Sequence, residues 1–304
     1  MSATTFNSAL LKPKYWSSWL LVGLSWLLAV LPSSAQAAIS AWLARRLAGS
    51  RNSRIRTIRQ NIEQCFADKT EAYRDQLLKD NLESSMLMVF DLLNMVWRSS
   101  KKMTASVQLI GAEHLERAVA EGKGVLLVTG HFTTLCQMFS KLGSLQTCYS
   151  LYRRMDNPVL EAQIYQRAMR QYSLELIHRK NIRDMLAKLA DNGTVAIVPD
   201  QDFGVSRGCF IPFFGIQTAT ITSIPQYAKQ ANSQVLMFSA YRENGRCVME
   251  FEPALEDYPS GDDIVDTQYW SDWLEAKIRL HPADYLWMHK RFKTRPEGED
   301  SFYS

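Results

Sequence analysis

Residues 124–131 read GVLLVTGH, and this short stretch decides the fold class. Its first six residues form an aliphatic, β-branched run, which is typical of a strand that is buried on both faces. A second run of this kind, TVAIV, occupies residues 194–198. Strands of this type occur in parallel sheets whose two faces are covered by helices.

Helical patterns alternate with these strands. The predicted helices cover residues 68–97, 157–172, 181–193 and 264–280. Their ends carry capping signals: a capping box opens the first, and asparagines open the second and third. Residues 235–241 and 248–252 flank Asn244-Gly245, a strong hairpin signal. The order of elements predicts an α/β fold with a mainly parallel central sheet flanked by helices.

The N-terminal part is strongly apolar. No residue from Tyr15 to Ala44 is charged, and four of them are tryptophans. We therefore expect residues 1–44 to be an N-terminal hydrophobic membrane-anchoring helix and residues 45–304 to be the globular domain. A cleaved signal peptide ending near residues 35–37 is the rival hypothesis. More arginines follow the segment than lysines precede it, which favours a retained anchor with the domain in the cytoplasm. The pattern fits both a spanning helix and one lying on the surface.

Composition narrows the choice of partners. The five cysteines are odd in number and form no C-x-x-C pair, so the sequence predicts reduced thiols and no zinc site. The net charge of +4 is too small to indicate a nucleic-acid partner. Basic residues gather at residues 45–59 and 290–295, where they suit anionic lipid headgroups or an acidic carrier protein.

His131 is the first candidate for chemistry, because it directly follows the buried strand and Gly130. In open α/β sheets, ligands gather at the carboxyl ends of the strands. A histidine with an ordinary pKa of about 6.5 takes a proton from a hydroxyl at neutral pH. At this point two hypotheses stay open: a catalytic base and a structural histidine.

The segment HFTTL after that strand resembles the first signature of the glycerolipid and lysophospholipid acyltransferase superfamily. In that signature a carboxylate follows the histidine five positions later. Similar blocks follow in the family's order, YRRMDNP at 152–158, PDQDFG at 199–204 and FIPFFG at 210–215. The tail at 285–298, YLWMHKRFKTRPEG, resembles the late acyltransferases of lipid A biosynthesis, of the lauroyl and palmitoleoyl type. The resemblance runs from about residue 6 to the end.

The resemblance implies a membrane-bound O-acyltransferase with a glycerolipid acyltransferase-like fold. His131 would deprotonate a hydroxyl of a Kdo-lipid A precursor, and that oxygen would attack a laurate-like or palmitoleate-like thioester of acyl carrier protein. Arg153 would stabilise negative charge at the catalytic site. Arg179, Asp200 and Asp202 would bind substrate, although a loop-capping carboxylate is an equal alternative for Asp200.

The same resemblance implies no metal and no cofactor. The expected partners are acyl carrier protein, the lipid A precursor and membrane lipids, with no nucleic acid. The expected location is the bacterial inner membrane, with the catalytic domain (45–304) facing the cytoplasm. The acyl-chain length, and the choice between acyl carrier protein and coenzyme A as donor, stay open.

One position departs from the pattern: Cys136 stands where the signature has its carboxylate. A neutral thiol is a poor substitute, since the carboxylate would fix the histidine tautomer and stabilise the imidazolium. Four hypotheses follow. Asp200 or Asp202 replaces the missing carboxylate; the chain is an impaired relative that binds lipid; Cys136 is a catalytic nucleophile activated by His131; or the cysteine is an engineered substitution.

Overall fold

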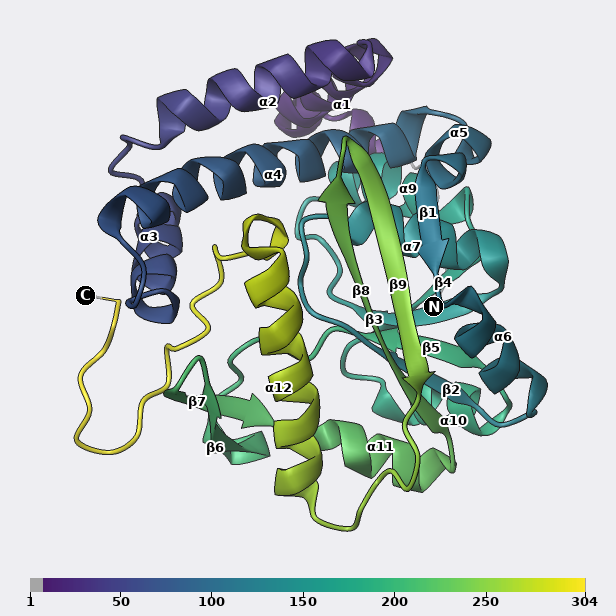
Figure 1. Cartoon of the computed structure of the whole chain (residues 1–304). Coiled ribbons are helices and arrows are strands. Elements are labelled where there is room, and N and C mark those ends of the chain that lie inside the picture. Colours follow the sequence, from purple (N-terminus) through teal and green to yellow (C-terminus); the bar gives the residue numbers. More distant parts are fainter. Residues whose placement is uncertain (1–7, 304) are drawn as a thin grey trace.

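The computed structural model describes residues 8–303. At its centre lies a seven-stranded sheet in the order β1-β9-β8-β2-β5-β3-β4 (Figure 1). Its strands are β1 (Val107–Ile110), β2 (Val125–Val128), β3 (Cys148–Tyr152), β4 (Leu174–His178), β5 (Thr194–Ile197), β8 (Gln234–Glu243) and β9 (Arg246–Ala254). Within this sheet only β8 and β9 pair antiparallel. Strands β6 (Gly208–Phe213) and β7 (Ile216–Ile221) form a separate antiparallel pair. The predicted mainly parallel α/β sheet is therefore confirmed.

Helices surround the sheet. They are α1 (Trp16–Val30), α2 (Ser33–Leu47), α3 (Ser53–Cys65), α4 (Glu71–Trp97), α5 (Ser100–Ala105), α6 (Ala112–Ala120), α7 (Leu135–Leu145), α8 (Pro158–Leu160), α9 (Gln166–Arg170), α10 (Ile182–Ala190), α11 (Ser223–Ala231) and α12 (Asp263–Leu280). Shorter helical turns are η1 (Ser8–Leu11), η2 (Pro13–Tyr15), η3 (Glu161–Tyr165), η4 (Val205–Arg207) and η5 (Pro282–Asp284). The long helix α4 crosses one end of the sheet, and α12 runs alongside β8 and β9 (Figure 1).

The order of the strands places helices on both faces. The connection from β2 through α7 to β3 runs across the sheet in one direction, and that from β4 through α10 to β5 runs in the other. Since such crossovers are right-handed, α7 and α10 lie on opposite faces. Helix α10 contacts α11, and α11 contacts α12, while α7 contacts α4 and α5. All residues of β2 and β5 are buried, as their apolar sequences predict.

The predicted helix starts are mostly observed. Asn157 caps α8 by accepting from the backbone N–H groups of Val159 and Leu160. The long helix α4 begins two residues later than the capping box at 68–71 predicts, because Thr70 is its cap and accepts from the N–H of Tyr73 at 3.2 Å. The predicted hairpin at Asn244-Gly245 is confirmed as the β8–β9 pair.

The N-terminal segment differs from the expected single helix. It forms two helices, α1 and α2, that are bent by 117°. The bend falls at Leu31-Pro32, because the ring of a proline disfavours helical backbone in the residue before it. Within residues 8–303 no single helix is both long and apolar enough to cross a membrane, and only this bent pair meets the criteria by length and composition.

The two N-terminal helices pack against the body of the protein. Both contact α4. The amide of Gln36 on α2 donates to Asn94 Oδ1 at 3.1 Å, and the indole N–H of Trp97 donates to Ser25 Oγ on α1 at 2.9 Å. The expected division after residue 44 falls inside α2. Helices α1 and α2 are thus attached to α4 by specific polar contacts.

Candidate active site

The candidate site lies at the carboxyl ends of two neighbouring strands. In the β2–β5 pair, Val128 is opposite Ile197. His131 follows Val128 by three residues, and Asp200 follows Ile197 by three residues. Because the strands are parallel and adjacent, equal offsets bring the two side chains to the same point on the sheet edge.

His131 and Asp200 are joined by two hydrogen bonds. Nδ1 of the His131 ring lies 2.5 Å from Oδ1 of Asp200, and the backbone N–H of His131 donates to Oδ2 at 2.9 Å. The hydroxyl of Tyr285 also donates to Oδ2, at 2.8 Å. The carboxylate therefore holds the ring and its backbone together, which fixes the orientation of the imidazole.

The electrostatics of this pair suit a proton acceptor. Asp200 is 1% exposed, and burial by itself would raise the pKa of its carboxyl. The charge of His131 and the hydrogen bonds from His131 and Tyr285 outweigh burial and hold the Asp200 pKa well below its ordinary value. An ionised Asp200 accepts a hydrogen bond from the N–H at Nδ1, so the second ring nitrogen, Nε2, carries the lone pair that can take a proton.

The backbone around His131 is paired with the segment that follows η5. The N–H of Leu286 donates to the carbonyl of His131 at 2.8 Å, and the N–H of Thr133 donates to the carbonyl of Asp284 at 2.7 Å. These bonds act like a short stretch of sheet between residues 131–133 and 284–286. The segment that carries Tyr285 thereby supports the loop that carries the histidine.

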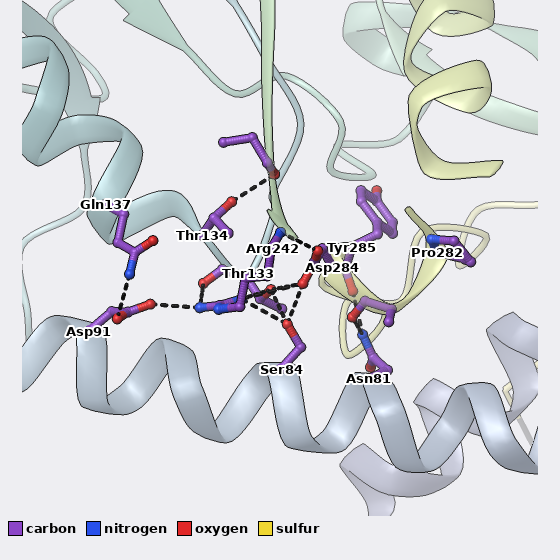
Figure 2. Close-up of polar contacts among 12 residues, drawn as sticks. Asn81, Ser84, Asp91, Thr133, Thr134, Gln137, Arg242, Pro282, Asp284 and Tyr285 are labelled. Carbon is purple, nitrogen blue, oxygen red and sulfur yellow. Dashed lines mark hydrogen bonds and ion pairs between the residues drawn. The ribbon is translucent and has the colours of Figure 1, made fainter. Parts of the chain in front are cut away.

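Beneath this loop lies a buried polar cluster around Arg242, which extends from β8 (Figure 2). Its guanidinium contacts Asp91 Oδ2 at 2.6 Å and donates to Ser84 Oγ and Thr133 Oγ1, each at 2.8 Å. The backbone N–H of Arg242 donates to Asp284 Oδ2 at 2.7 Å. The cluster joins α4, β8, η5 and the His131 loop, so it holds together the elements that form the site.

A glutamine stands at the free side of the imidazole. The side-chain nitrogen of Gln201 lies 3.1 Å from Nε2 of His131 and 3.3 Å from Nε2 of His289. The two imidazole rings meet edge to face, with centroids 5.0 Å apart. Burial, with a smaller contribution from His131, lowers the pKa of His289 to about 4. His289 is therefore neutral at physiological pH.

Arg153 and Arg179 lie on the rim of the same sheet edge. Tyr152 and His178 end β3 and β4 opposite each other, and the two arginines follow them directly. Both arginine side chains are exposed, and Arg153 forms a long ion pair with Asp156 at 3.4 Å. None of the contacts found for the described residues joins either guanidinium to His131. The two arginines are thus placed to meet a ligand from solvent.

Asp202, expected to bind substrate, is engaged in the fold. Its Oδ1 accepts from the N–H of Gly204 at 2.8 Å and from Thr294 Oγ1 at 2.9 Å, while Oδ2 accepts from the N–H of Thr294 at 2.6 Å. These bonds fasten the loop after β5 to the C-terminal tail.

Cys136 occupies a different environment from His131. It is the second residue of α7, and the charges that act on its thiol are those of Asp91 and Arg242. Burial, with a smaller contribution from Asp91, raises the Cys136 pKa to about 12. Within residues 8–303 no hydrogen bond joins Cys136 to His131. The thiol is held in its protonated form, whereas a nucleophilic cysteine needs a depressed pKa.

Sequence reasoning named His131 and Asp200 but missed three neighbours in the site. Tyr285, Gln201 and His289 all fall inside the blocks quoted for the family resemblance, yet no spacing rule links them to His131. They meet because the C-terminal tail runs back across the sheet edge, which only the tertiary structure reveals. Arg242 directly follows the predicted strand at residues 235–241, and no other feature of the sequence marks it as part of the site.

Comparison with known proteins shows the family of the chain. Residues 3–294 match the family model described as bacterial lipid A biosynthesis acyltransferase. The chain is 30% identical to the lipid A biosynthesis lauroyltransferase of Escherichia coli K12, over 98% of both chains. It is 27% identical to the palmitoleoyltransferase of the same organism, again over 98% of both. Identity to the myristoyltransferase is 23%, over 97% of this chain and 92% of that one.

Proposed function

Because this chain belongs to the family of bacterial lipid A biosynthesis acyltransferases, we propose that it moves a fatty-acyl chain from acyl carrier protein to a hydroxyl of a Kdo-lipid A precursor, with His131 as general base. Membership makes the protein an acyltransferase of lipid A biosynthesis. The donor, the acceptor hydroxyl and the base are the parts that we propose. The relatives differ in the acyl chain that they are named for, so the laurate-like or palmitoleate-like chain is also part of the proposal.

The observation that carries the proposal is the bond of 2.5 Å between Nδ1 of His131 and the buried carboxylate of Asp200. A base oriented by a carboxylate is the arrangement that activates a hydroxyl nucleophile in acyl transfer. Asp200 thus supplies the group that the signature places at position 136. The hypothesis of an impaired, lipid-binding relative depended on the missing carboxylate at position 136. Because the carboxylate of Asp200 contacts His131, that argument for an impaired relative no longer applies.

The proposed steps use this geometry directly. Nε2 of His131 takes the proton from the acceptor hydroxyl while its oxygen attacks the carbonyl carbon of the thioester. Asp200 stabilises the imidazolium that forms. The carbon–sulfur bond then breaks, the ester remains on the acceptor, and the proton on Nε2 passes to the departing sulfur. Arg153 and Arg179 on the exposed rim would meet the negative charges of the acceptor or the carrier protein.

The test is an acyl-transfer assay with purified protein, a Kdo-lipid A precursor and acyl carrier proteins loaded with chains of several lengths. We expect transfer by the unmodified protein, with one chain length preferred, and no transfer by His131→Ala. The same chains presented on coenzyme A identify the donor. Equal transfer by His131→Ala and the unmodified protein would rule out His131 as the base.

We also propose that α1 lies in the surface of the inner membrane, with the catalytic domain toward the cytoplasm. The 15 residues of α1 span about 22 Å, which is shorter than the bilayer's apolar core of about 30 Å. Large apolar side chains on its outer face are exposed: Trp16, Leu20, Leu21, Leu24, Trp26, Leu27 and Val30. Basic residues flank the pair of helices at both ends, as expected for contact with anionic headgroups.

Sedimentation with phosphatidylglycerol vesicles tests this placement. Replacing Leu20 and Leu24 by glutamate removes two exposed apolar side chains, and we expect partitioning to fall about 100-fold. Val265→Glu is the matched control, because the exposure of Val265, 58%, lies between the 75% of Leu20 and the 48% of Leu24, but Val265 lies on another element, α12. If the control reduced partitioning as much as the double variant, α1 would not be the membrane-binding face.

A further inference from the structure

Gln201 bridges two imidazole rings with a single nitrogen. That nitrogen carries two hydrogens, and it lies within hydrogen-bonding distance of Nε2 of both His131 and His289. Nδ1 of His131 is bonded to Asp200, so Nε2 of that ring is an acceptor. An amide nitrogen only donates, so Nε2 of His289 is an acceptor as well. One NH₂ group therefore satisfies two lone pairs that point into the same space.

The neutral state of His289 keeps this second lone pair available. Burial lowers the pKa of His289 to about 4, so its ring does not take up a proton at neutral pH. The ring is half-buried, and the carbonyl of its own backbone is held by the side-chain amide of Asn61 at 2.8 Å. His289 is consequently a fixed, uncharged acceptor directly beside the proposed base.

The proposed reaction requires Gln201 to leave Nε2 of His131, because the acceptor hydroxyl must donate to that same nitrogen. A hydroxyl brings only one hydrogen. If it replaced the two-donor NH₂ group alone, Nε2 of His289 would lose its partner in a half-buried site. A polar group left unpaired in this way weakens binding, and that penalty distinguishes ligands that supply the missing donor from those that do not.

We propose that His289 is a specificity residue, which accepts a hydrogen bond from a second donor group of the acyl acceptor, next to the hydroxyl that reacts on His131. The inference rests on the proposed function and deepens it by naming the chemistry of the acceptor. That acceptor carries an N–H or a second O–H a few atoms from its reacting hydroxyl. Together the two donors reproduce the pair of hydrogens that Gln201 presents to the two rings.

The test compares two synthetic analogues of the lipid A precursor that differ at one atom. The reacting 3-hydroxyacyl chain is joined to the headgroup through an amide in one analogue and through an ester in the other. The amide offers an N–H near the hydroxyl, and the ester offers none. We expect the unmodified enzyme to favour the amide by about 10- to 100-fold in kcat/KM.

Variants assign that preference to His289. In His289→Leu the ratio of the two kcat/KM values should fall towards one, and His289→Gln should restore part of it, because its side-chain oxygen again accepts. His114→Leu, a histidine substitution on α6 outside the site, should keep the full ratio. Thermal unfolding shows whether each variant is folded.

Two results overturn the inference while the proposed function stands: equal rates for the two analogues with the unmodified enzyme, or an unchanged ratio in folded His289→Leu. If His289→Leu does not fold, the ratio of the two kcat/KM values in His289→Gln decides. It should lie below the ratio of the unmodified enzyme, and an unchanged ratio would overturn the inference. Transfer to neither analogue would refute the proposed function, and the inference with it.

Discussion

Replacing Asp200 by asparagine changes one atom of the site but removes its negative charge. In the native site, Oδ2 accepts two hydrogen bonds, from the backbone N–H of His131 and the hydroxyl of Tyr285. The asparagine oxygen keeps both bonds only if the side-chain NH₂ faces Nδ1. That orientation turns Nδ1 into an acceptor and moves the ring proton to Nε2, where a base needs its lone pair.

The expected loss of kcat follows from the wrong tautomer of His131 and the missing negative charge at position 200. In serine proteases the same change costs about 10⁴-fold in kcat, which corresponds to about 5.5 kcal/mol of transition-state stabilisation. The geometry here is comparable, with a buried carboxylate at 2.5 Å from Nδ1. We therefore expect Asp200→Asn to lower kcat by about 10³- to 10⁴-fold.

The assay is acyl transfer from loaded acyl carrier protein at saturating acceptor, with circular dichroism and thermal unfolding to establish that each variant is folded. Tyr285→Phe is the matched control: it removes one hydrogen bond to Asp200 but keeps the charge, so its loss should be about 10-fold or less. Cys136→Ala, which leaves the His131–Asp200 pair untouched, should retain nearly full activity.

The reasoning would be refuted by a folded Asp200→Asn that keeps more than about a tenth of the native kcat. It would also be refuted if Cys136→Ala lost as much activity as Asp200→Asn. That second result would return the catalytic role to position 136.

Three further predictions concern buried charge. In urea unfolding, Cys136→Glu should be less stable than the unmodified protein, because the new carboxylate would compete with Asp91 for Arg242. It should also fail to raise kcat. A faster enzyme would show that a carboxylate at position 136 supports the base. Arg242→Leu should lower the free energy of unfolding by about 3 to 5 kcal/mol, since Asp91 and Asp284 lose their cation, and a change below about 1 kcal/mol would contradict this. Burial lowers the pKa of His289 from 6.5 to about 4, so only the unfolded chain binds that proton between these values. Its contribution to stability is complete above pH 6.5 and is lost as the pH falls toward 4, and His289→Leu should flatten this part of the profile by about 1.4 kcal/mol per pH unit.

The central strands and the base could be predicted from sequence because their signals are local. Every residue of β2 and β5 is buried and all but Thr194 are apolar, and His131 closely follows the first of these strands. β1, β3 and β4 were not predicted, since each mixes fully buried positions with less buried ones and lacks a continuous apolar run. The bend at Pro32 was also missed. The segment was predicted as one helix because no residue on either side of Pro32 is charged, whereas the proline disfavours helical backbone at Leu31.

The candidate site could be predicted only in part, because its residues are far apart in the sequence. Asp200 was one of two candidate carboxylates, with Asp202, and its pairing with His131 depends on β2 and β5 being neighbours, which the sequence does not determine. His289 and Gln201 lie in different blocks that meet only through the tail. The family resemblance places such residues in a block but does not indicate what each one contacts.

The stretch from Tyr285 to Tyr303 makes the site depend on a helix that lies outside the sheet. It runs without regular helix or strand and is tied back by Asn61, which donates to the carbonyls of Trp287 and His289 and accepts from the hydroxyl of Tyr303. Asn61 lies on α3, outside the sheet, yet it holds the segment that carries Tyr285 and His289. A change at α3 would therefore displace the hydroxyl that donates to Asp200 and the ring beside His131, although α3 itself contributes no side chain to that pair.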